Sequence, residues 1–135
     1  MKPSGSGAPV LSVLSSEKRP KIAMLLAGGK ILPRRGQLEL LQDIAEQASI
    51  DIFFVKKAVG LDPLSEEFNR NDQPAVSLAR SYANDLIVDL RLYAASWGIC
   101  IPSEVPLHHP IEYQLMEFRG CIGEMLETIC GESQK

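Results

Sequence analysis

Apolar residues recur at helical spacing along most of the chain after residue 19. The clearest stripe runs from Ala75 to Trp97, where apolar side chains lie three or four positions apart and Gly98 follows. A second stripe runs from Ile111 to Ile129, with a proline before it and Gly131 after it. The two stripes predict two long amphipathic helices in the C-terminal half.

The N-terminal half predicts shorter helices. Pro20 suits the first position of a helix over residues 21–27, which ends at a pair of glycines. Apolar spacing predicts an amphipathic helix over 37–48, and the polar residues at 49–51 favour a turn before a further helix over 52–59. The chain is therefore expected to be all-α: a short N-terminal helical unit followed by two long antiparallel helices.

An α/β alternative remains open for this N-terminal half. Residues 21–29 would form a buried strand, residues 37–48 a crossover helix and residues 50–55 a second strand with alternating apolar side chains. Periodicity does not distinguish helix from strand in such short apolar runs. The alternative is therefore an N-terminal βαβ unit.

Length and composition indicate one intracellular domain. Residues 1–19 lack periodicity and are expected to be a disordered tail, which leaves residues 20–132 as a single helical domain. The longest apolar run, residues 22–27, is too short to span a membrane. The sequence has 3 cysteines, an odd number, and no pair at C-x-x-C spacing, so we expect a reducing compartment and a cytoplasmic location.

No local motif indicates catalysis, a metal or a cofactor. The Gly29-Lys30 pair resembles a phosphate-binding loop, but Met24 stands where that loop requires its first glycine, and no hydroxyl residue follows the lysine. His108 and His109 are adjacent on a proline-rich linker and would point in opposite directions, which disfavours a shared metal. We therefore expect a protein that is not an enzyme and holds no metal or cofactor.

Residues 44–59 carry a second pattern. A small alanine stands at Ala45, an apolar residue follows the expected turn at Ile50, Asp51 can cap the next helix, and Val55 is β-branched. In these spacings the segment resembles the helix-turn-helix of bacterial DNA-binding regulators. The resemblance implies that the apolar residues fill the angle between two helices and that the second helix enters the major groove of DNA.

The start of that second helix departs from the family pattern. Base edges are recognised by hydrogen-bonding side chains, whereas this chain has Ile52, Phe53 and Phe54 there. Apolar and aromatic side chains are typical of protein interfaces, so these three are expected to bind a protein partner. The basic residues that the resemblance would place on DNA phosphates are Arg34, Arg35, Lys56 and Lys57.

Charge also favours a protein partner. Residues 1–60 hold nine basic and five acidic side chains, but residues 61–135 hold five and twelve, and the whole chain has a net charge of −3. This overall charge opposes association with DNA. We expect a small regulatory or adaptor protein that acts through protein–protein interaction, with a transcription factor or a secretion component as the expected partner. The alternative is a helix-turn-helix DNA-binding transcriptional regulator.

Two glycines interrupt the last predicted helix. Gly120 and Gly123 each cost about 1 kcal/mol of helix stability relative to alanine, which favours a compensating close crossing with another helix. Two long apolar stripes in so small a chain also favour self-association as a homodimer.

Overall fold

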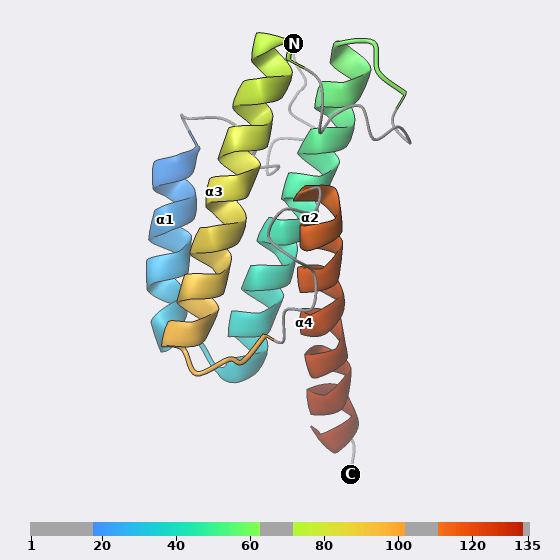
Figure 1. The fold of residues 1–135 in the computed structure, drawn as a ribbon. Coiled ribbons are helices and arrows are strands. Elements are labelled where there is room, and N and C mark those ends of the chain that lie inside the picture. Colours follow the sequence, from blue (N-terminus) through green and yellow to red (C-terminus); the bar gives the residue numbers. More distant parts are fainter. Residues whose placement is uncertain (1–17, 63–71, 102–110, 134–135) are drawn as a thin grey trace, which may run out of the picture.

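The computed structural model describes residues 18–62, 72–101 and 111–133, and every regular element in these ranges is a helix (Figure 1). The all-α prediction is confirmed. The βαβ alternative is wrong, because helices occupy both of the segments proposed as strands. The elements are α1 (Arg19–Gly28), the 3-10 helix η1 (Gly29–Ile31), α2 (Arg34–Ala58), α3 (Pro74–Ser96) and α4 (Ile111–Ser133).

The direction of the helices differs from the predicted arrangement. Helices α1, α3 and α4 run in one direction and α2 runs in the opposite direction (Figure 1). The prediction that the two long C-terminal helices, α3 and α4, are antiparallel neighbours is therefore wrong. The main partner of α4 is α2. An apolar stripe shows which face of a helix is buried, but not which other helix covers it.

Two side-chain contacts and one close approach of a glycine show the register of α2 and α4. Lys56 near the end of α2 meets Glu112 near the start of α4, and Glu46 meets Arg119 further along α4. Closer to the start of α2, a side chain added at Gly123 of α4 would meet the end of Gln42. The residue numbers fall on one helix as they rise on the other, so the pair is antiparallel.

The turn expected at residues 49–51 is absent, because α2 is a single helix through that segment. No glycine or proline interrupts residues 37–59. Two polar side chains that could have stabilised a turn instead form hydrogen bonds within the helix. The Ser49 hydroxyl donates to the Ala45 carbonyl at 3.3 Å, and the Gln47 amide donates to the Asp51 carboxylate at 3.0 Å. The helix ends before Gly60, whose φ of 83° suits glycine.

The core lies where α2 faces the other three helices. Its α2 side includes the small residues Ala45 and Ala48, both fully buried, which let neighbouring helices approach closely. The α4 side includes Phe118, also fully buried. Burial of each large apolar side chain stabilises the fold by about 1.5–3 kcal/mol. The buried apolar residues of α2 and α4 are Leu38, Leu41, Ile44, Ala45, Ala48, Ile52, Ile111, Leu115, Phe118 and Ile122.

The lower end of the bundle in Figure 1 is held by η1. The buried Gln37 side chain donates to the Gly29 carbonyl at 3.0 Å, which ties η1 to α2. The Gly29 backbone also lies against Trp97 at the end of α3. A Cβ atom added at Gly29 would stand 2.5 Å from the Trp97 ring, closer than two carbons can approach. Only glycine therefore fits at residue 29 without a shift of Trp97 or of η1.

Replacing Gly29 by alanine should lower the free energy of unfolding by about 1–3 kcal/mol, because either Trp97 or η1 must move. Gly28→Ala is the matched control: the adjacent position has open space, and alanine should leave stability unchanged or raise it by up to about 1 kcal/mol. Urea denaturation followed by circular dichroism measures both. Equal effects of the two substitutions would contradict this packing.

Candidate functional site

Three large apolar side chains are exposed together on the second half of α2. Ile50, Phe53 and Phe54 are 41%, 43% and 59% exposed. Their spacing of three and four residues places them on one face of the helix. They line a groove of about 360 Å³, and its other lining residues are Glu46, Ser49 and Arg119. We call this set of six residues the aromatic groove.

The two phenylalanine rings stand edge to face. Their centroids are 5.7 Å apart and the ring planes meet at 84°. This is a favoured geometry for an aromatic pair, so each ring restrains the other. The Lys57 ammonium lies 5.7 Å from the centroid of the Phe53 ring, within the range of a cation–π contact. The groove therefore presents aromatic carbon surface with a cation at one edge.

Helix α4 forms the opposite wall of the groove. The Arg119 guanidinium donates to the Glu46 carboxylate of α2 at 3.3 Å. Both side chains are exposed, so this ion pair contributes about 0–1 kcal/mol and mainly positions Arg119. Met116, one helical turn before Arg119, is 59% exposed. The apolar surface thus continues from α2 onto α4.

The structure separates the three residues that were predicted to bind a partner. Phe53 and Phe54 are at the surface, but Ile52 is 1% exposed and belongs to the core. The prediction for Ile52 is wrong because α2 continues without a turn. In an unbroken helix Ile52 lies one turn after Ala48 and two turns after Ala45, on the buried face.

The prediction that Lys56 contacts phosphate is also wrong. Its side chain is 2% exposed, and its ammonium meets the Glu112 carboxylate at 2.6 Å. Lys56 stands in the last turn of α2 and Glu112 in the first turn of α4. Each charge therefore lies at the helix end whose dipole favours it, which adds to the direct attraction between the two groups.

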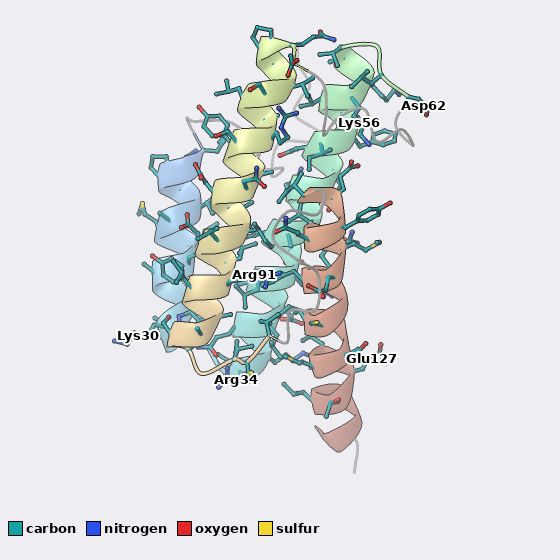
Figure 2. All side chains as sticks on the ribbon, in the orientation of Figure 1. Lys30, Arg34, Lys56, Asp62, Arg91 and Glu127 are labelled. Carbon is teal, nitrogen blue, oxygen red and sulfur yellow. The ribbon has the colours of Figure 1, made fainter. Side chains whose placement is uncertain are left out.

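The remaining basic candidates do not form one surface. Arg35 pairs with Glu39 at 3.3 Å, one turn along the same helix. Arg34 and Lys57 are exposed but lie at opposite ends of α2, about 35 Å apart along the helix axis. Figure 2 shows Arg34 at the lower end of the bundle and Lys56, next to Lys57, near the upper end.

Arg34 instead borders a second groove, of about 380 Å³, at that lower end. Its surface is largely apolar, and Cys100 contributes a free thiol. The lining residues are Arg34, Leu38, Gly98, Ile99, Cys100, Met125, Thr128 and Ile129. This groove lies at the opposite end of α2 from the phenylalanines.

The first half of the exposed face of α2 is acidic. Glu39, Asp43 and Glu46 follow one another at intervals of four and three residues and are all exposed. Partial burial of the Asp43 carboxyl raises its pKa, and the negative charges of Glu46 and Glu39 raise it further. The contribution of these two neighbouring carboxylates reflects the negative charge beside the aromatic groove.

The two glycines of α4 have different surroundings. A side chain at Gly123 would come within 3.3 Å of the Gln42 amide nitrogen, so this glycine faces α2. A side chain at Gly120 would meet nothing within 4 Å, and Gly120 is exposed. The structure therefore places only Gly123 beside a neighbouring helix of the same chain.

In the described segments, no three His, Cys, Asp or Glu side chains are grouped so that they could hold a metal ion. His108 and His109 lie outside those segments. None of the described helices is long and apolar enough to cross a membrane. Comparisons of the chain with protein-family models, with curated proteins and with solved structures found no significant match.

The buried ion pair of α2 and α4 gives an asymmetric prediction. Lys56 is enclosed, whereas the Glu112 side chain is 33% exposed and can be solvated. Glu112→Ala should therefore cost about 3 kcal/mol or more of unfolding free energy, because it leaves a buried ammonium without its carboxylate. Lys56→Met removes the charge but retains the apolar stem, and should cost less than about 1.5 kcal/mol.

Chemical denaturation of both variants measures this difference. Lys57→Ala serves as the control, because the neighbouring lysine is exposed and its loss should change stability by no more than about 0.5 kcal/mol. If Lys56→Met were as harmful as Glu112→Ala, the enclosed charge could not be the cause.

Proposed function

We propose that this chain is a small regulatory or adaptor protein, not an enzyme, that acts by binding another protein through the aromatic groove. The observation that carries the proposal is the exposure of Ile50, Phe53 and Phe54 around one groove on one helix. Single exposed apolar residues are common, whereas a contiguous group with a polar border is typical of an interaction site.

The chemistry of the groove fits a protein interface. Aromatic and arginine side chains supply a large part of the energy at such interfaces, and both kinds are present in Phe53, Phe54 and Arg119. The edge-to-face ring pair has few free torsions, so binding would restrict little side-chain motion. A complementary apolar side chain could therefore bury both rings at low entropic cost.

The proposed partner is a cytoplasmic protein, such as a transcription factor or a secretion component. The cytoplasmic assignment rests on the odd cysteine count and on the lack of a pair at C-x-x-C spacing in the sequence. A homodimer that uses the same groove is the alternative form of a protein-binding role.

Duplex DNA is the competing ligand class. A duplex-binding surface needs several cations close together, because affinity arises mainly from phosphate neutralisation. Here Lys56 is enclosed by its pairing with Glu112, and the exposed cations Arg34 and Lys57 stand at opposite ends of α2. These positions favour a protein partner over DNA.

The test is affinity purification from cells of the source organism with the immobilised full chain. Phe54→Asp should reduce recovery of the bound partner at least about tenfold, because it removes an aromatic anchor and adds a charge that must be desolvated. Leu92→Asp is the matched control: this α3 residue is 63% exposed, against 59% for Phe54, and lies outside the groove.

Quantitative mass spectrometry of the bound proteins, with circular dichroism to verify folding, gives the answer. If Phe54→Asp leaves recovery of the bound partner unchanged, the proposal is contradicted. Tight, salt-sensitive binding of duplex DNA by the purified chain would also contradict it, since that result would favour the competing ligand class.

A further inference from the structure

The exposed face of α2 is a single line of side chains with two halves of different character. Neighbouring members are three or four residues apart, except for the adjacent Phe53 and Phe54, and the line from residue 39 to residue 57 covers about 27 Å of helix surface. The first three members are acidic, the next three are apolar, and a lysine closes the line. In order, the members are Glu39, Asp43, Glu46, Ile50, Phe53, Phe54 and Lys57.

A second line of residues, on α4, lies next to this line of α2. The pairing of Arg119 with Glu46 and the approach of Gly123 to Gln42 place this line beside the face of α2 just described. In chain order its members are Tyr113, Met116, Gly120, Gly123 and Glu127. Because α4 is antiparallel to α2, its apolar end is beside the phenylalanines and Glu127 is at the acidic end of α2.

The middle of the α4 line has no side chains. Gly120 and Gly123 are consecutive members of it, and the space above Gly120 is open. The absence of a Cβ allows another backbone to approach closely. The groove of about 360 Å³ lies at the apolar end of the seam between the two lines, and the surface beside it is low at Gly120. We define this seam, from the groove to Asp43 and Glu127, as the α2–α4 trough.

The other end of the trough carries negative charge that the bundle only partly compensates. Arg35 pairs with Glu39, and Arg119 pairs with Glu46. No ion pair is recorded for Asp43 or Glu127 with the described residues, and Figure 2 shows Glu127 projecting from α4 on the side away from α1 and α3. Partial burial is the largest cause of the raised pKa of Asp43, and the nearby carboxylates of Glu46 and Glu39 add to it.

We propose that the α2–α4 trough binds a basic amphipathic helix of the partner protein. Apolar side chains of that helix, three or four residues apart, would pack against Ile50, Phe53, Phe54 and Met116. Its backbone would cross α4 over Gly120, and its lysines or arginines, about two to three turns away, would meet Asp43 and Glu127. The assignment rests on the proposed protein-binding function and adds the class of ligand.

The experiment is a display selection of helical peptides on the full chain. The library consists of 18-residue peptides in which apolar, acidic and basic residues are equally frequent at the varied positions. The selected peptides are expected to carry two apolar anchor residues at helical spacing and a net positive charge. Their affinity should fall at least about tenfold with Phe54→Asp and with Gly120→Leu, the latter because leucine would fill the trough.

Charge reversal tests the acidic end separately. The double substitution Asp43→Lys and Glu127→Lys should weaken the winning peptides at least about tenfold, and added salt should weaken them in the wild-type chain. Leu92→Asp is again the matched control and should change these affinities less than about twofold, since α3 lies outside the trough.

Each other outcome has a distinct meaning. Suppose that Phe54→Asp weakens binding of the selected peptides, but that these peptides are not enriched in basic residues or bind the charge-reversed variant equally well. This result would overturn the basic-helix assignment and leave the proposed function intact. Selected peptides whose affinity is unchanged by Phe54→Asp would overturn both the assignment and the proposed function. Sedimentation that shows a wild-type dimer dissociated by Phe54→Asp would assign the trough to a second copy of the chain, and so overturn the basic partner helix.

Discussion

The structure depends on the continuity of α2 from Arg34 to Ala58. One unbroken helix has one buried face and one exposed face along its whole length, because side chains keep a fixed angular spacing. The buried face supplies the surface on which α1, α3 and α4 pack. The exposed face carries the acidic half and the aromatic half of the trough in a single line. A turn at residues 49–51 would break both faces at the same place.

The candidate groove on α2 is formed by the pairing of α2 with α4. The enclosed contact between Lys56 and Glu112 favours this register at one end, because sliding of the helices would break a buried ion pair. The same register brings Arg119 to Glu46 and Gly123 to Gln42. The groove is therefore a property of two helices, and neither would present it alone.

Much of the fold could be predicted from local sequence signals. Pro20 and Pro74 stand in the first turns of α1 and α3, where a missing backbone N–H costs no hydrogen bond. Gly60 and Gly98 follow α2 and α3 with positive φ angles, which glycine adopts without steric strain. The break at residues 49–51 was wrongly predicted from polar side chains. Ser49 can bond to backbone either within a helix or in a turn, so its identity alone does not decide between them.

The candidate site could be predicted only in part, because local sequence does not show whether the helix continues through residues 49–51. Phe53 and Phe54 fall outside the buried stripe, so they are exposed whether or not the helix is interrupted. Ile52 and Lys56 depend on the phase of the helix, which an assumed turn changes, and both are buried in the continuous α2. Arg119 carries no local signal, because its place beside the groove arises from tertiary packing.

The continuity of α2 can be measured directly with spin labels at residues 39 and 57, both exposed, in a chain whose 3 cysteines are replaced by serine. Double electron–electron resonance should give one narrow distance distribution, consistent with about 27 Å between the two Cα atoms of a straight helix. A helix-turn-helix with its arms near 100° would bring these Cα atoms to about 20 Å, and a distribution centred there would contradict the account.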